Sequence, residues 1–348
     1  MSNEQAVPEH KAVLVLPHIR VQNANAISSP MTWGFPAITA FTGMMSALER
    51  NLGRDAGIAF YGVGVICHRF EAQVTSGGYE RAFHLTRNPV LADGSTAGIV
   101  EEGRAHLDVT LVFDVLVDDD HRGDAERTAL AEQVAHQLAG MRLAGGSVMP
   151  ALPGPVRRST RPVLAMVADD SDAQRQQLRR LARQWMPGFA LVSRDDLLQT
   201  RLAELRSADP AATALDAWLD LSRWNTRAVE RRPQPEFAGD DSPPAVEWIT
   251  DPRVGWTVPI PVGFAALSEL HAPGTVGRAR DTTTPFRFVE TVWSIGQWVS
   301  PHRLKSVAEL VWTTGHDPAR PTEHGLYRCR NAYVPATMSA DMADTTPN

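Results

Sequence analysis

The stretch HLDVTLVFDVLV, residues 106–117, decides the fold class. Apolar side chains recur at every second position in it, namely Leu107, Val109, Leu111, Phe113, Val115 and Val117. His106, Asp108, Thr110 and Asp114 stand between them. Alternation with period two is typical of a strand that has one face on a core and the other face polar. An acidic turn at 118–120 ends this strand.

Residues on the N-terminal side continue the pattern. Positions 58–74 also alternate, but the apolar positions move by one residue near His68 and Arg69, which predicts a second strand with a bulge. The apolar run 12–16 predicts a short buried strand that ends at Pro17. A polar loop over 20–36 is expected next, and then a helix that carries Phe41, Met44, Met45, Leu48 and Leu52 inward.

On the C-terminal side, Leu130, Val134, Leu138 and Met141 predict an amphipathic helix, and 143–149 a loop that enters a fourth strand. The order of elements is then β, α, β, β, α, β. This order predicts an α+β fold with a ferredoxin-like, RRM-like core, an arrangement that many RNA-recognition domains share. Fold alone does not assign a function.

The second half of the chain is expected to be mostly helical, with an arginine-rich helix over 172–185. The prediction for the domains is a ferredoxin-like core over 12–155, a helical insertion over 156–230, a flexible linker or loop over 231–244, a tryptophan-rich C-terminal lobe over 245–334 and a disordered tail over 335–348.

Composition excludes several classes of protein. The 348 residues are 43% hydrophobic and 21% charged, which indicates a globular chain. No apolar run approaches the roughly 20 residues of a membrane span, and residues 1–10 are polar without an export signal, so a cytoplasmic location is expected. Two cysteines allow no disulfide framework. The net charge of −6 argues against a protein that binds nucleic acid by bulk electrostatics.

The cationic residues are two lysines, Lys11 and Lys305, and 32 arginines. Arginine suits phosphates and base edges, although a GC-rich genome explains the bias as well.

Several catalytic motifs are missing. Neither lysine follows a glycine, as a P-loop would require, and Cys67 stands where a dinucleotide fingerprint that begins at Gly62 needs glycine. Thr96 stands where a nucleophile elbow needs serine. The histidines and cysteines show no metal-binding spacing, so neither a metal nor another cofactor is predicted.

The expected loop over 20–36 carries side chains that can read unpaired bases and phosphates: Arg20, Gln22, Asn23, Asn25, Ser28, Ser29 and Trp33. The alternative is that the Asn and Ser side chains cap the next helix and close turns.

Other candidates for phosphate contacts are basic residues at turns or bulges, namely His68, Arg69, Arg87 with Asn88, and Arg142 beside Gly145 and Gly146. Surface ion pairs and plain tight turns explain them equally well. A further basic stripe, Arg175, Arg179, Arg180 and Arg183, faces RNA, a partner or only solvent.

Longer motifs add a resemblance. They are QNANAISSP (22–30), TWGFP (32–36), CHRFEAQ (67–73), LTRNP (85–89), GSTA (94–97), SPHR (300–303) and the stretches 99–107, 141–147 and 187–194. They closely resemble the Csy-two family of small subunits of the type I-F CRISPR complex, in the same order from about Val13 to Arg328.

The resemblance implies a non-catalytic RAMP protein with a ferredoxin-like core. It implies a heterodimer with the large Csy subunit, which grips the 5′ handle of the guide CRISPR RNA beside the backbone Csy subunits and contributes to recognition of target DNA. It adds His302 and Arg303 to the RNA-binding candidates. In this family a separate subunit cuts the precursor RNA.

Two other functions stay open from the sequence. One is a metal-independent endoribonuclease that uses Tyr61, His68 or His106 as acid and base. The other is an assembly adaptor that contacts protein only.

Overall fold

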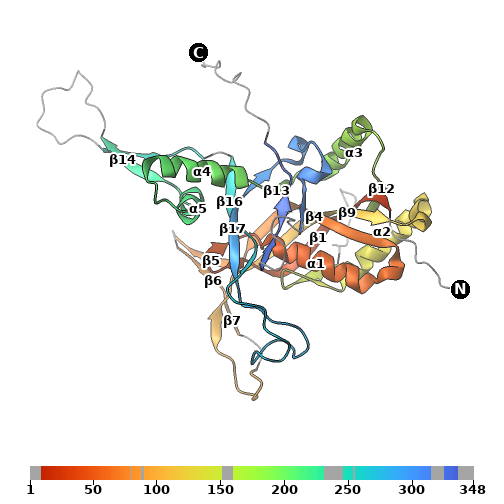
Figure 1. Cartoon of the computed structure of the whole chain (residues 1–348), viewed down its shortest axis with the longest axis horizontal. Coiled ribbons are helices and arrows are strands. Elements are labelled where there is room, and N and C mark those ends of the chain that lie inside the picture. The colour runs from red at the N-terminus through yellow and green to blue at the C-terminus, as the bar shows by residue number, and fades with distance from the viewer. Residues whose placement is uncertain are drawn as a thin grey trace, which may run out of the picture.

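The structure is a computed structural model and describes residues 9–78, 80–87, 90–150, 160–230, 246–253, 255–314 and 325–335. Its centre is a curled antiparallel sheet (Figure 1). In chain order the strands of this sheet are β1 (His10–Asn25), β4 (Ile58–Ala72), β9 (Arg104–Val117), β10 (Arg142–Leu143), β11 (Gly146–Met149), β12 (Val163–Met166), β13 (Phe189–Ser193), β16 (Trp256–Ala266), β17 (Val289–Val299), β18 (Val311–Thr313), β19 (Leu326–Arg328) and β20 (Arg330–Asn331). The main path is β10-β11-β1-β9-β4-β13-β17-β16-β19, while β12 pairs with β1, and β18 pairs with β4 and β20.

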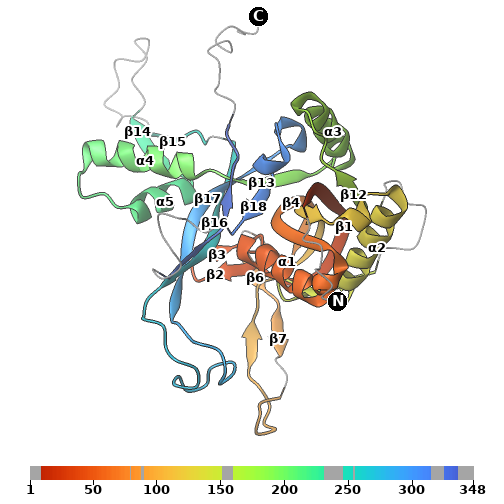
Figure 2. The ribbon, with the colours of Figure 1, turned by 45° about the vertical axis from the view of Figure 1, so that its right-hand side comes forward.

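The described helices are α1 (Ile38–Leu52), α2 (Asp124–Ala139), α3 (Ser171–Gln184), α4 (Asp195–Ala208) and α5 (Ala214–Ser222), with the short turns η1 (Arg54–Ala56), η2 (Asp119–His121), η4 (Pro301–Arg303) and η5 (Val307–Glu309). Separate hairpins are β2 (Ile27–Ser29) with β3 (Thr32–Trp33), β5 (Val74–Gly77) with β6 (Glu80–Phe83), β7 (Leu85–Arg87) with β8 (Ile99–Glu101), and β14 (Thr226–Glu230) with β15 (Val246–Thr250). Helices α4 and α5 project from the sheet together with β14 and β15. The β7–β8 hairpin projects from the sheet in a different direction (Figures 1 and 2).

The two faces of the sheet have separate cores. The apolar side chains predicted from the alternation in β9 are all buried, and they pack with α1 and α2 on one face. Val112 of β9 lies on the other face, where Leu178 and Leu181 of α3 pack over it together with Val13 and Ile66. The predicted strand and the predicted helices in this region are therefore confirmed.

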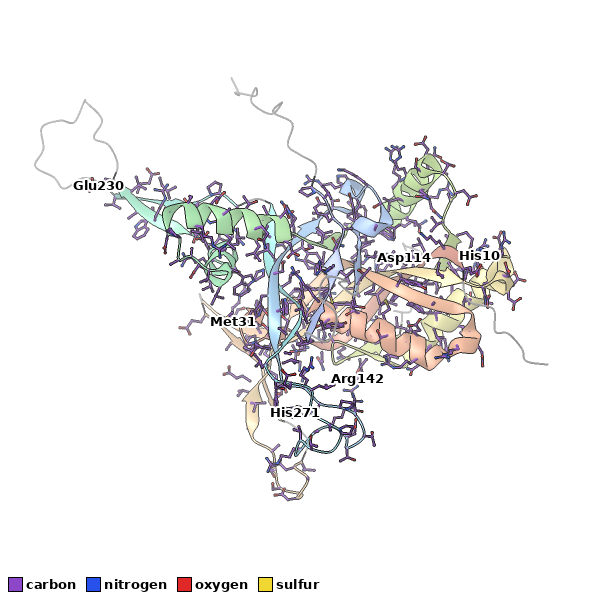
Figure 3. The ribbon with its side chains drawn as sticks, in the orientation of Figure 1. His10, Met31, Asp114, Arg142, Glu230 and His271 are labelled. Atoms are coloured by element: carbon purple, nitrogen blue, oxygen red, sulfur yellow. The ribbon has the colours of Figure 1, made fainter. Side chains whose placement is uncertain are left out.

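Strand β1 corrects two expectations. Pro17 does not end the strand, because the chain passes Pro17 in an irregular step and pairs again with β9 from Ile19. His18 takes up the irregularity at a φ of 52°. The expected loop over 20–36 is instead the second half of β1 followed by the β2–β3 hairpin, whose turn carries Met31 (Figure 3). Its side chains are polar because this part of β1 has an exposed face.

The predicted irregularity near His68 is confirmed, since the register of β4 against β9 shifts between Cys67 and Arg69. The expected loop over 143–149 is correct only for its first part, because residues 146–149 already form strand β11. Ala144 and Gly145, at φ of 49° and 76°, form the tight turn between β10 and β11, and β11 pairs with β1.

The expectation of a mostly helical second half is correct only up to Ser222. From Thr226 on, the regular structure of the described residues consists of strands apart from the short turns η4 and η5. Strand β17 pairs with β13, so the tryptophan-rich part continues the same sheet. The physical reason is that Trp, Val and Ile alternate in β16 and β17, which favours strands over helices.

The proposed linker over 231–244 and all of the proposed tail over 335–348 except Pro335 lie outside the described residues, and the domain boundaries stay a prediction. Within the described part of the chain, no helix is both long and apolar enough to span a bilayer.

Candidate nucleic-acid interface

Half of one sheet face carries polar side chains instead of a packed helix. The register places Arg20 of β1 and Arg69 of β4 on either side of Asp108 of β9, and Glu71 beside His106. Gln22 lies opposite Ser147 of β11. We call this surface the open face; its residues are His18, Arg20, Gln22, Asn23, His68, Arg69, Glu71, Gln73, His106, Asp108 and Thr110. Most of them are half-buried or exposed, and Thr110 is buried beneath them.

Two stacked histidines border the open face toward α3. His68 donates from Nδ1 to the carbonyl oxygen of Pro187 (2.8 Å), because a carbonyl can only accept. In the neutral ring its Nε2 therefore accepts from the hydroxyl of Thr110 (2.8 Å). Nδ1 of His18 lies 3.0 Å from the carboxylate of Asp108. Both rings are thus held in fixed orientations by neighbours in the protein.

A second cluster lies toward the end of the same face. The side-chain amide of Gln73 donates to Asn23 Oδ1 and lies 3.2 Å from Nε2 of His106. The backbone N–H of Asn23 donates to the other ring nitrogen, Nδ1 (3.3 Å). Asn23 has a φ of 59°, a left-handed conformation that asparagine tolerates better than most residues. The irregular backbone thus brings two amides and an imidazole together at a partly exposed site.

Three candidates from the 20–36 segment make contacts within the protein instead. The side chain of Asn25 bonds both the N–H and the carbonyl of Ile27. Ser28 and Ser29 bond the hydroxyl of Thr32, and Ser29 also accepts from the indole N–H of Trp293 (2.9 Å). These contacts agree with the turn-closing alternative. Trp33 differs, because it is 46% exposed and packs only loosely against Phe83 at 5.9 Å between ring centroids.

The glycines of the β10–β11 turn have different roles. A Cβ on Gly146 would lie 2.6 Å from the carbonyl oxygen of Gln22 and 2.7 Å from the nitrogen of Ala24, so the close approach seen here is to β1. Gly145 has open space around it. Arg142 is exposed on the edge strand β10 (Figure 3), and contact between Arg142 and phosphate stays a prediction.

The other basic candidates are spread over the surface. Arg69 is paired with Glu71 (2.6 Å). Arg179 and Arg183 of α3 line one groove with His302 of η4, so two separately predicted basic sites meet there, with Arg180 and Arg303 exposed nearby on the same elements. Arg175 is paired with Asp172. The side chain of Arg87, and Asn88, lie outside the described residues.

The sequence did not single out His18 and Gln73 as binding residues. His106 lies in the repeating polar positions of β9, and Gln73 directly follows β4; the alternation in β9 was the available signal for His106. Only the register shows that they meet Asn23, and only the irregular step at Pro17 turns His18 toward Asp108.

Known proteins of one family match this chain over most of its length. Residues 14–329 match the sequence family described as CRISPR-associated protein (Cas_Csy2). A protein of Pseudomonas aeruginosa (strain UCBPP-PA14), named CRISPR-associated protein Csy2, is 46% identical over 331 residues, which cover 93% of this chain and 96% of that protein. This chain belongs to the Csy2 family. The resemblance inferred from the motifs is therefore confirmed.

In this Csy2 family member, two of the three candidate catalytic groups lie far apart. Tyr61 and His68 are seven residues apart on β4, which corresponds to about 23 Å along a strand. Burial, helped by the charge of Asp108, raises the pKa of the Cys67 thiol to about 12, so this thiol is not poised as a nucleophile. Among the described residues, no three His, Cys, Asp or Glu side chains gather as metal ligands would.

Proposed function

We propose that this Csy2 chain is a non-catalytic subunit of a type I-F CRISPR surveillance complex and that its open face holds the 5′ handle of the guide RNA. Family membership supports a role in a CRISPR complex. The arrangement of polar groups on the open face supports the binding of RNA.

We further propose that β11, β1, β9 and β4 with α1 and α2 form a ferredoxin-like RAMP core. Two observations support it. Along the chain the elements run β1, α1, β4, β9, α2, β11, and across the sheet the strands run β11-β1-β9-β4, all antiparallel. In RNA-recognition domains with this order of elements, the sheet itself is the surface on which unpaired bases bind. The open face is the corresponding surface here.

The cluster of Asn23, Gln73 and His106 is the observation that carries the proposal. Its two amides offer both donors and acceptors beside the imidazole, with Asn23 exposed and Gln73 and His106 half-buried, as recognition of base edges requires. Arg20 lies on β1, the strand that also carries Asn23. It donates to the carbonyl of Pro150 (3.2 Å), a contact that leaves its other N–H groups for a phosphate. Reading groups and a phosphate-binding group therefore lie side by side.

Two alternatives fit less well. An endoribonuclease needs an acid and a base near one phosphate, but both ring nitrogens of His68 are bonded within the protein, and His68 is separated from Tyr61. A protein-only adaptor gives no reason for an exposed cluster of hydrogen-bonding groups next to arginine.

The resemblance also implies the partners that we propose: the large Csy subunit in a heterodimer, the backbone Csy subunits and, in the assembled complex, target DNA. The complex would act in the cytoplasm, where the guide RNA is. The exposed arginines of α3 and the exposed Trp33 are available for such contacts.

The test is a filter-binding titration of the chain, purified with its large partner, against a labelled handle RNA. We expect saturable binding that Arg20→Ala together with Gln22→Ala weakens at least about tenfold. Arg50→Ala, at an exposed position on α1, is the matched control and should bind as the wild type does. Two results would contradict the proposal. One is that heparin, added as a competing polyanion, displaces the handle RNA as readily as unlabelled handle RNA does. The other is that the double variant binds the handle RNA with unchanged affinity.

A further inference from the structure

A hollow opens between strand β1, helix α3 and the segment 305–308, which includes the start of η5. It lies outside the open face, farther along the same side of the sheet, where α3 covers the strands. Asp114 of β9 lies in it, on the side of the sheet that faces α3 (Figure 3). Three segments that are remote in sequence thus build one concave site.

Both lysines of the chain line this hollow. The other 32 cationic residues of the chain are arginines. Lys11 and Lys305 come from opposite ends of the chain and line the same hollow. In the part of the chain that the structure describes, neither ammonium group takes part in an ion pair. Lysine differs from arginine in carrying a compact charge on a flexible stem, which can follow a carboxylate without the planar geometry of a guanidinium.

The charge in the hollow is not balanced by its own walls. Arg175 also lines it but is paired with Asp172. Burial raises the pKa of the Asp114 carboxyl, and the charge of Lys11 opposes part of that rise. Among the residues that line the hollow, one half-buried carboxyl thus stands against two ammonium groups, and the remaining positive charge there favours an anionic group from outside. Three further carboxylates lie near the lysines but not in this lining: Glu309 accepts from the backbone N–H of Lys305 (2.7 Å), and Glu9 and Asp169 line an adjoining hollow with Lys11.

The floor of the hollow is aliphatic. It is formed by Val13, Val167, Leu178, Leu181 and Val307, and no aromatic side chain lines it. Such a floor adds affinity only if an apolar group covers it, at about 25 cal/mol per Å². A strand of nucleic acid brings phosphates, which the lysines could bind, but it finds no ring here on which a base could stack. The combination of an aliphatic floor and a cationic rim fits a protein segment better.

We propose that this site, the lysine hollow, binds an acidic segment of a protein partner. An apolar side chain of the segment covers the aliphatic floor, and its carboxylates pair with Lys11 and Lys305. The proposal rests on the proposed function only because the partner is sought among the subunits of the assembled complex.

The two lysines make the test selective. The complex is assembled by co-expression with the other Csy subunits and guide RNA and treated with a carbodiimide, which joins amines directly to carboxylates. Every link through a lysine side chain of this chain then reports the lysine hollow. We expect Lys11 or Lys305 to be joined to an Asp or Glu of another subunit. We also expect both lysines to react more slowly with acetic anhydride in the complex than in the free chain.

Three results would overturn the proposal. Equal acetylation in the complex and in the free chain would show that nothing covers the hollow. Protection that disappears on nuclease treatment, without any carboxylate link, would assign the hollow to nucleic acid. The absence of any copurifying subunit would show that the hollow has no partner in the complex. Binding of handle RNA to the free chain is measured separately, and it can succeed or fail independently of this result.

Variants give the second measurement. Lys11→Glu with Lys305→Glu should lower recovery of the partner at least about tenfold in a tagged pull-down, because like charges then meet across the contact. Lys11→Arg with Lys305→Arg keeps the charge and should retain most of the recovery. Arg50→Glu on the opposite face is the control for a change of net charge. Handle RNA should bind all four proteins alike, and normal recovery with the double Glu variant contradicts the proposal.

Discussion

The imidazole rings of His18 and His68 stack with their centroids 4.3 Å apart and their planes tilted by 31°. They come from β1 and β4, which do not pair with each other because β9 lies between them. Each histidine stands at a shift in the register of its strand against β9. Such irregularities re-aim side chains, and here they turn both rings over Thr110 of the intervening strand.

His68→Ala should therefore lower stability without revealing any catalytic role. The substitution removes the bonds to Pro187 and Thr110 and the stacking on His18, so we expect the free energy of unfolding to fall by about 1–3 kcal/mol. Urea unfolding measures the loss, with Tyr61→Phe at a half-exposed position as a control of near-zero effect. Precursor guide RNA should stay intact with either protein. Site-specific cleavage by the wild type that His68→Ala abolishes would falsify the non-catalytic assignment.

The two glycines of the β10–β11 turn should respond differently to alanine. Gly146→Ala places a methyl group against backbone atoms of β1, which cannot move aside as a side chain could, and we expect a loss of about 1–3 kcal/mol. Gly145→Ala meets no neighbour and should cost about 1 kcal/mol, from its φ of 76° alone. Guanidinium unfolding of both variants compares them directly. A larger loss for Gly145→Ala would show that β11 and β1 tolerate separation.

The carboxyl of Asp114 predicts a dependence of stability on pH. Because burial raises its pKa in the folded protein, the folded state binds this proton more tightly than the unfolded state does. The resulting stability is fully present below the ordinary carboxyl pKa, about 3.9, and is lost as the pH rises through the raised value. Asp114→Asn should thus melt at a higher temperature than the wild type at pH 7, and the difference should shrink toward pH 3.

Calorimetry at several pH values tests this, with Asp119→Asn as the contrasting variant. Hydrogen bonding and charge from His10 lower the pKa of Asp119, so its replacement should instead reduce stability at neutral pH. If Asp114→Asn lowers the melting temperature at pH 7, the attraction between Asp114 and Lys11 outweighs the cost of burial.

Some of the fold could be predicted because local patterns determine it. The alternation in 106–117 shows which side chains of β9 are buried, and the change of phase near His68 locates the irregularity in β4. Pro17 misled the prediction because a proline usually interrupts a strand, whereas here the chain bulges and resumes pairing. The polar residues after Pro17 predict a loop, because polarity alone does not distinguish a loop from a strand with an exposed face.

The candidate site was predictable only in part, because its contacts depend on register. Arg20, Gln22, Asn23, His68 and Arg69 do share one face, but Asn25, Ser28 and Ser29 are used within their own turns. The sequence shows that such side chains can hydrogen-bond, not with which partner. The meeting of Lys11 with Lys305 has no local signal at all, since it depends on how α3 and the segment 305–308 pack on the sheet.

The last prediction separates reading of the handle from bulk affinity. Gln22 and Gln73 carry amides that can recognise base edges, whereas Arg20 contributes a charge that recognises any phosphate. Gln22→Ala with Gln73→Ala should reduce discrimination between native and scrambled handles by about 2- to 10-fold per hydrogen bond lost, at roughly 0.5–1.5 kcal/mol each. Arg20→Ala should weaken the binding of both RNAs alike. It should also reduce the slope of log K against log salt concentration by about 0.7.

Asn25→Ala is the matched control, because its amide bonds Ile27 within the turn and should not affect which RNA is preferred. Filter binding at three salt concentrations gives both quantities from the same titrations. Full discrimination in the double glutamine variant would mean that bases are read elsewhere, and the exposed Trp33 would then be the next residue to test by substitution. Loss of discrimination in Arg20→Ala alone would instead mean that the arginine itself contacts a base edge, since a phosphate contact carries no sequence information.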